Sequence, residues 1–219
     1  MPINPDSVIG AIEAGFKKTD ASINEVCKLN YWADGSTVAC AVVLGNMLFV
    51  GNLGDTEIVL ACNTKPVFPP SGTAAAAPVR CDCEAICLTQ KHLATEEPEA
   101  LRVKQAGGRI LFGRVEGSLA VSRAFGDLDY KTPKNRLLVD TVTSIPFVVH
   151  VELTPDNQFM IIACDGMWDR VTYREAVTLC SEAFRNGKSP RDAAALLVAT
   201  ALERRTLDNV SCIVVRFKW

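Results

Sequence analysis

The chain has 219 residues, with 23 basic against 25 acidic side chains and a formal net charge of −2. This balance excludes a strongly basic surface for nucleic acid or membrane, and the length suits one domain with a substantial core. No apolar stretch approaches the roughly 20 residues that cross a bilayer, and the first residues lack the basic start and apolar run of a secretory signal. We therefore expect a single domain over residues 1–219, located in the cytoplasm or nucleus.

Apolar periodicity and turn residues predict a mixture of helices and strands. Predicted helices combine an apolar face with a capping residue, and predicted strands are apolar runs bounded by turn residues. In chain order the expected elements are a helix capped by Asp6 or Ser7, strands 38–44 and 47–51 joined by Gly45-Asn46, a strand 57–62, a helix from Thr95 to Gly107-Gly108, extended segments near 139–142 and 147–153, a strand ending at Asp165, helices begun by Thr172 and Ser189 with Leu197 and Leu202 on an apolar face, and a strand 210–217.

Residues 63–85 break this pattern. They contain four prolines, a Ser-Gly pair and a run of alanines without any period, so we expect a flexible insertion loop. The pair Cys81-x-Cys83, with Cys87 nearby, suggests a metal- or redox-responsive module. No second Cys/His cluster at zinc-like spacing completes such a site, and the alternative is that these are reduced, buried thiols.

A hydrophobic strand that ends in two carboxylates is the most informative stretch. Within the run Phe159–Asp169, Asp165-Gly166 follows the apolar residues directly and Asp169 adds a second carboxylate. Carboxylates at the mouth of a buried strand lose hydration, and a hard divalent cation is the usual compensation. The alternative is a simple turn, because Asp-Gly is a common turn pair. Both interpretations stay open from this run alone.

Five separated segments, taken together, carry a resemblance to a known family. They are Gly35-Ser-Thr37, Gly54-Asp-Thr56, Arg114–Asp127, Ala163–Asp169 and Asp208-Asn209. In this order they resemble the metal-dependent protein serine/threonine phosphatases of type 2C, over a region from about residue 8 to 217. The long Arg114–Asp127 motif is very specific, whereas Gly54-Asp-Thr or Asp208-Asn alone would be weak.

The resemblance implies an α+β fold, a four-layer α-β-β-α sandwich of two antiparallel sheets flanked by helices. It also implies two Mn²⁺ or Mg²⁺ ions at one end of the sandwich, where a metal-bridging water attacks phosphoserine or phosphothreonine. Asp165 and Asp208 match metal-ligand aspartates of the family, with a purely structural role as the alternative. Asp169 matches a carboxylate associated with a third, weaker metal position, and a structural role is equally open for it.

Other matched residues are expected to serve the fold. Arg123 and Asp127 are expected to pair or to order the loop after them, and Gly54-Asp55 to form a tight turn. The two histidines, His92 and His150, are expected to be packing or surface residues. No catalytic residue is identifiable in this chain by the resemblance.

The sequence departs from the family pattern in its first part. Family members begin with two strands that carry a phosphate-binding Arg and a Glu-Asp pair. An Asp-Gly-His-Gly-Gly motif follows, with the metal-bridging Asp and the proposed general-acid His. No Asp-Gly-His occurs here, and the chain starts at the helix that should follow this motif, so the N-terminal strands are expected to be missing. The family usually has Asp where this chain has Lys91, which brings a positive charge to the third metal position.

These departures predict weak binding of Mn²⁺ or Mg²⁺ and little or no phosphatase activity from this chain alone. Two carboxylates compete poorly with the hydration of Mg²⁺, and the lost cation and Arg leave the phosphate without stabilisation. One hypothesis is a type 2C phosphatase whose given start is too late. Another is a pseudophosphatase that binds a phosphoprotein or a regulatory protein, in one variant with a second chain supplying the absent strands. The third is the cysteine module. Unpaired sheet edges would favour association.

Overall fold

The computed structural model describes residues 3–63, 85–131 and 140–219. The described residues fall into two compact units, unit 1 from 1–40, 51–55 and 91–148, and unit 2 from 41–50, 56–90 and 149–219. Most of the predicted loop 63–85 lies outside the described residues, and so do Cys81 and Cys83. In the part of the chain that the structure describes, no helix is long and apolar enough to cross a membrane.

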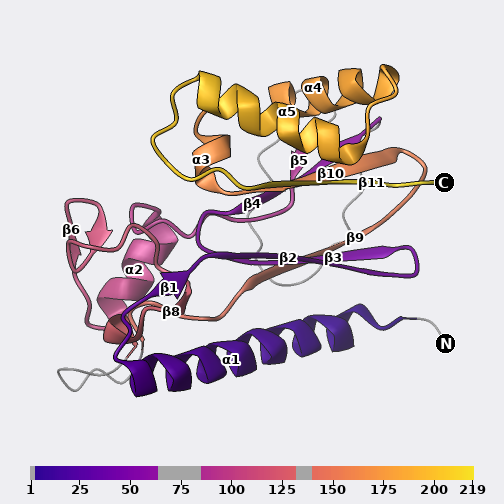
Figure 1. Ribbon diagram of the computed structural model, residues 1–219. Coiled ribbons are helices and arrows are strands. Elements are labelled where there is room, and N and C mark those ends of the chain that lie inside the picture. Colours follow the sequence, from indigo (N-terminus) through magenta and orange to yellow (C-terminus); the bar gives the residue numbers. More distant parts are fainter. Residues whose placement is uncertain (1–2, 64–84, 132–139) are drawn as a thin grey trace. The chain divides into compact units, whose positions relative to one another are not determined.

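Unit 2 contains a four-stranded antiparallel sheet in the order β11-β10-β4-β5. Three helices follow β10 along the chain, and Figure 1 shows α4 and α5 lying over this sheet. The elements of the unit are β4 (Glu57–Cys62), β5 (Ala85–Cys87), β10 (Asn157–Ala163), α3 (Asp165–Trp168), α4 (Tyr173–Arg185), α5 (Pro190–Glu203) and β11 (Cys212–Arg216). The predicted strand 210–217 is therefore shorter than expected at both ends.

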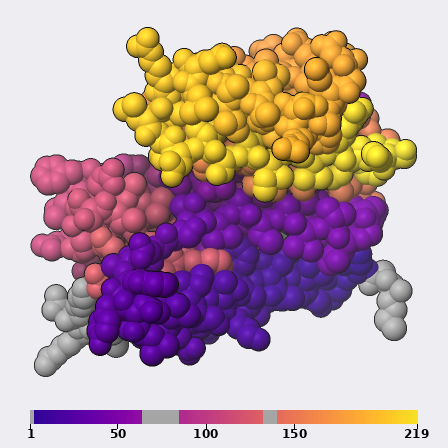
Figure 2. Space-filling view, viewed as in Figure 1, coloured from indigo at the N-terminus to yellow at the C-terminus, as the bar shows by residue number. Residues whose placement is uncertain are grey.

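The core of unit 2 lies between this sheet and its helices. Side chains of β10 such as Phe159 and Ile161 pack with Val177 of α4 and Leu197 of α5, all of them nearly or fully buried. Burial of these apolar side chains is the main stabilising contribution. The outward faces of α4 and α5 contribute to the orange and yellow surface in Figure 2. Leu202, predicted to face the core, is 57% exposed on that surface, because the apolar face of α5 is formed instead by smaller residues such as Ala201.

The predicted caps of α4 and α5 are confirmed. The Thr172 hydroxyl accepts a hydrogen bond from the backbone N–H of Glu175 at the start of α4. Ser189 caps α5 through a reciprocal pair of bonds with Asp192, which satisfies donors that a helix start leaves open.

Unit 1 is built around helices and short strand pairs. Its elements are α1 (Pro5–Asn30), β1 (Gly35–Ser36), α2 (Glu97–Gln105), β6 (Ile110–Leu111), β7 (Arg114–Val115), β8 (Phe125–Gly126) and the 3₁₀ turn η1 (Leu128–Tyr130). The expected helices exist, but their caps differ from the prediction. Asn4 caps α1 in place of Asp6 or Ser7, because its side chain accepts from the N–H of Asp6. Glu96 takes the N-cap position of α2 in place of Thr95.

A buried ion-pair cluster organises unit 1. Glu99 of α2 accepts hydrogen bonds from Arg123, Arg102 and Ser122. Arg123 was expected either to pair with Asp127 or to order the following loop. In the structure Arg123 pairs with Glu99 rather than with Asp127. Burial, and next the charge of Arg123, lower the pKa of the neighbouring His92 to about 3. His92 is fully buried, as a packing residue is expected to be.

A third sheet has the order β2-β3-β9, with β2 at Val38–Leu44, β3 at Met47–Leu53 and β9 at Phe147–Glu152. Residues of each of these strands belong to both units. The predicted turn between β2 and β3 is confirmed, with Gly45 at a φ of 58°. The extended segment expected near 139–142 does not form a strand over 140–142, because Thr141 and Val142 direct their N–H groups at the carbonyl of Tyr130.

Candidate functional site

Asp165 lies where the central strand of the unit 2 sheet ends. Strand β10 pairs with both β4 and β11, and Asp165 is the first residue of α3, two positions after the last strand residue Ala163. The side chain is half-buried, and its Oδ1 accepts a hydrogen bond from the N–H of Gly166 over 2.8 Å. The carboxylate is therefore oriented by its own backbone at the edge of a rigid sheet.

Asp208 approaches the same end of the sheet from the other direction along the chain. It precedes β11, the neighbour of β10, and Asn209 donates its N–H to Asp208 Oδ1 over 2.7 Å. A Cβ built on Gly166 would overlap the carbonyl oxygen of Asn209 and lie 3.2 Å from the Cβ of Asp208. The glycine thus allows the two aspartate-bearing segments to touch, and the structure brings the segments of Asp165 and Asp208 together.

Asp169 is the C-cap residue of α3, and its N–H donates to the carbonyl of Asp165 over 2.8 Å. Four residues apart on one helical turn, the two side chains lie on the same face, and Asp169 is exposed. Lys91 is half-buried in unit 1. Within 3–63, 85–131 and 140–219, no group of three or more His, Cys, Asp or Glu side chains is placed to hold a metal ion.

Asp165 and Asp208 are the type of ligand that a hard cation prefers, but two carboxylates are fewer ligands than such a cation needs. Asp165 and Asp208 supply carboxylate oxygens, which Mg²⁺ and Mn²⁺ prefer. In each residue the hydrogen bond from the backbone uses Oδ1, and no described residue donates to Oδ2. Because Mg²⁺ keeps most of its waters when only one or two carboxylates bind it, these residues fit a weak site.

Trp168 fixes α3, and with it Asp165, to the sheet. Its Nε1–H donates to the carbonyls of Ala163 and Glu57 over 2.9 and 3.3 Å, and its ring packs edge-on against Tyr173 at 5.1 Å. The buried Glu57 carboxylate accepts from the Tyr173 hydroxyl and from the Cys87 thiol. Burial raises the pKa of both the Tyr173 hydroxyl and the Cys87 thiol. The sequence motifs did not predict these contacts, because Glu57 and Cys87 are far from Trp168 and Tyr173 in the chain.

Replacing Gly166 by alanine is expected to lower the free energy of unfolding by about 1 to 3 kcal/mol, because the new methyl group must displace the Asn209 backbone. Gly10→Ala is the matched control. A Cβ at Gly10 meets nothing within 4 Å on helix α1, so this change should be neutral or stabilising. Urea denaturation of both variants checks the prediction, and an equal effect of the two would contradict it.

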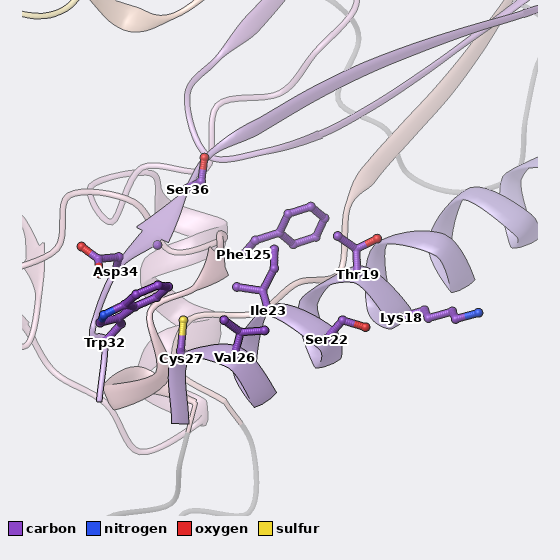
Figure 3. Close-up of a pocket in the computed structure, with 11 residues that line it drawn as sticks. Lys18, Thr19, Ser22, Ile23, Val26, Cys27, Trp32, Asp34, Ser36 and Phe125 are labelled. Carbon is purple, nitrogen blue, oxygen red and sulfur yellow. The ribbon is translucent and has the colours of Figure 1, made fainter. Parts of the chain in front are cut away.

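A separate pocket lies within unit 1. It has a volume of about 640 Å³, and its surface is mainly apolar although Lys18, Ser22 and Asp34 are among the residues that line it. Figure 3 shows that the helix α1 contributes Ile23, Val26 and Cys27, and that Trp32 and Phe125 also line the pocket. The sequence motifs did not indicate this pocket, because its residues come from a helix face, a loop and two short strands.

Comparison with known proteins shows the family of the chain. The family model described as protein phosphatase 2C matches residues 4–210. The chain belongs to the protein phosphatase 2C family. This match confirms the resemblance found in the sequence motifs. Members of this family are generally dependent on Mn²⁺ or Mg²⁺.

Individual relatives agree with this assignment. Protein spalten of Dictyostelium discoideum is 38% identical over 210 residues, which are 96% of this chain and 20% of spalten. Probable protein phosphatase 2C 8 of Arabidopsis thaliana is 35% identical over 95% of this chain and 57% of its own length. The human integrin-linked kinase-associated serine/threonine phosphatase 2C is 36% identical over 84% of this chain and 45% of its own length. The chain thus spans at most 57% of the length of these three relatives.

Solved structures show the same fold. The serine-threonine phosphatase 2C of Toxoplasma gondii superposes with a TM-score of 0.76 at 26% identity, over 98% of this chain and 68% of that one. A sex-determining protein of C. elegans has the same TM-score at 23% identity, over 99% of this chain and 48% of that one. The predicted α+β fold of protein phosphatase 2C is therefore confirmed.

Proposed function

We propose that this chain carries part of the metal site of a protein serine/threonine phosphatase, in which Asp165 and Asp208 ligate Mn²⁺ or Mg²⁺. The observation that supports this proposal is the contact of the two aspartate-bearing segments at Gly166. A bound cation would neutralise phosphate oxygens and lower the pKa of a coordinated water. Asp169, one turn along α3, is a candidate for a weaker, additional cation position.

The protein side of this chemistry is mainly orientation. The N–H groups of Gly166 and Asn209 hold one oxygen of each carboxylate, so that the other oxygen points to a fixed place. Trp168 keeps α3 attached to the sheet. With two carboxylates as the proposed ligands, we expect weak cation binding and little or no hydrolysis of phosphoserine or phosphothreonine by this chain alone.

Titration of the purified chain with Mn²⁺ tests the proposal. Wild type should bind Mn²⁺ with a Kd on the order of 0.1 to 1 mM, as weak carboxylate sites bind divalent cations. Asp165→Asn should weaken the binding at least about tenfold, since a carboxylate ligand is lost. Glu182→Gln, which removes an exposed carboxylate from α4, is the control and should leave it unchanged. The expected inactivity is contradicted if the chain hydrolyses a phosphopeptide with Mn²⁺ and Asp165→Asn abolishes that hydrolysis.

A second candidate function is a pseudophosphatase that binds a phosphoprotein or a regulatory protein without catalysis. The observation that favours it is the apolar pocket along α1, with Val26 and Trp32 47% and 53% exposed. A further route of association is the edge of the unit 2 sheet, where β11 is an outer strand. The Mn²⁺ titration separates the two functions, because only the metal-site proposal requires binding that depends on Asp165.

A further inference from the structure

The thiol of Cys164 joins the end of β10 to the segment that leads into β11. The regular ladder between these strands ends at the pair Ala163 and Cys212. Beyond it, the N–H of Cys164 donates to the carbonyl of Ser211 over 3.2 Å, and the N–H of Ser211 donates to Cys164 Sγ over 3.2 Å. The thiol itself donates to the carbonyl of Asn209 over 3.3 Å. The side chain thus accepts a hydrogen bond from Ser211 and donates one to Asn209, two residues before it.

These bonds matter because the Asp208 loop has mainly local contacts of its own. Asp208 is exposed, its N–H donates to the hydroxyl of Thr206 over 3.4 Å, and its Oδ1 accepts from the next residue. Its attachment to the strand end that carries Asp165 includes the packing at Gly166, the bonds to Cys164 and the packing of Val210 against the core of unit 2. A ligand on an unattached loop must lose conformational freedom when it binds a cation, which weakens the binding.

We propose that Cys164 is a positioning residue that holds Asp208 beside Asp165 for a divalent cation. This inference rests on the proposed function and adds a residue to it. Cys164 acts through its two hydrogen bonds to the Asn209–Ser211 segment, and the aspartates are the ligands.

The chemistry of the side chain defines which replacements preserve the role. A serine hydroxyl can accept from the Ser211 N–H and donate to the Asn209 carbonyl as the thiol does. An alanine methyl can do neither. Cys164→Ser should therefore keep the Mn²⁺ affinity within about threefold of wild type, and Cys164→Ala should weaken it about tenfold, the size expected for loss of one or two modest hydrogen bonds. Cys40→Ala removes a half-buried thiol from β2 in the same way and is the matched control.

Two measurements on each variant test the inference. The first is the Mn²⁺ affinity, from the electron paramagnetic resonance signal of free Mn²⁺. The second is the hydrogen-exchange rate of the Ser211 amide in the metal-free protein, which reports the attachment directly. We expect Cys164→Ala to accelerate this exchange and to weaken Mn²⁺ binding, while Cys164→Ser and Cys40→Ala change neither. Thermal denaturation confirms that each variant is folded.

Each other result has a definite meaning. Unchanged Ser211 exchange in Cys164→Ala overturns the attachment, whatever the metal does. Faster exchange with unchanged Mn²⁺ affinity overturns the positioning role. A wild-type chain that binds no Mn²⁺ contradicts the proposed function and, with it, the role of Cys164 toward a cation, and the exchange data then show whether the attachment exists independently. Weak binding in both Cys164→Ser and Cys164→Ala also overturns the inference, since the hydroxyl should substitute for the thiol.

Discussion

Replacing Glu99 by alanine is expected to lower the free energy of unfolding by about 3 to 5 kcal/mol, because a buried ion pair is broken from one side. The residue is 2% exposed. Its carboxylate lies 2.5 Å from Nη2 of Arg123 and 3.2 Å from Nε of Arg102, and it accepts from the Ser122 hydroxyl over 2.6 Å. Removing it would leave two largely buried guanidinium groups without the anion that they share. Urea denaturation followed by circular dichroism measures the loss.

Glu116→Ala is the control for this substitution. Glu116 also pairs with an arginine, since its Oε2 lies 2.8 Å from Nη2 of Arg109, but that arginine side chain is 72% exposed. Exposed pairs contribute less than about 1 kcal/mol, because water screens the charges. A loss for Glu99→Ala no larger than that for Glu116→Ala would show that the buried cluster has no special role in stability.

Acidification from pH 6.5 to pH 3 is expected to remove on the order of 4 kcal/mol of stability through His92. Burial lowers the pKa of His92 from 6.5 to about 3 in the folded protein. The unfolded chain therefore takes up a proton first as the pH falls. The stability associated with the neutral imidazole is present above about pH 6.5 and is lost as the pH falls toward 3.

A neighbouring carboxyl adds its own dependence at lower pH. Burial would raise the pKa of Glu99, but the hydrogen bonds from Arg123 and Ser122 and the nearby arginine charges outweigh it and lower this pKa from 4.5 to about 2. The contribution of Glu99 is therefore present above about pH 4.5 and is lost between there and pH 2. Between pH 4.5 and 6.5 the slope should come mainly from His92.

His92→Asn tests the assignment of this slope. The carboxamide oxygen can accept the hydrogen bond that the N–H of Gly54 donates to His92 Nδ1 over 3.1 Å, and it does not titrate. The plot of unfolding free energy against pH should flatten between 4.5 and 6.5, whereas His150→Asn, which retains His92, should keep the slope. A wild-type slope in His92→Asn would assign the acid sensitivity to other groups.

Local sequence signals predicted the elements better than they predicted the interactions between them. The turn at Gly45, the cap at Ser189 and the strand before Asp165 all depend on residues close in the chain, and the structure confirms them. The cap of α1 was misplaced because several polar residues near Pro5 can serve as a cap, and only the fold selects Asn4.

The candidate site shows the same limit. Motif order indicated Asp165 and Asp208, and the structure brings their segments together. Sequence alone gave no signal for the Cys164 thiol between them, nor for the pairing of Glu99 with Arg123, because these contacts form only after distant segments have packed. From the sequence, a cysteine beside Asp165 is expected to act as a small apolar residue, and only the structure reveals its hydrogen bonds.

The position of Asp165 and Asp208 at the same end of adjacent antiparallel strands has a consequence for variation of the chain. Their spacing is set by the ladder between β10 and β11, in which neighbouring strands lie about 4.8 Å apart. The helices α3, α4 and α5 connect the two aspartates along the chain. The turn at Gly187 between α4 and α5 is exposed. Insertions at this turn would alter the outer surface and leave the separation of the carboxylates unchanged. Changes in the outer surface formed by these helices can therefore occur without a change in the relative position of Asp165 and Asp208.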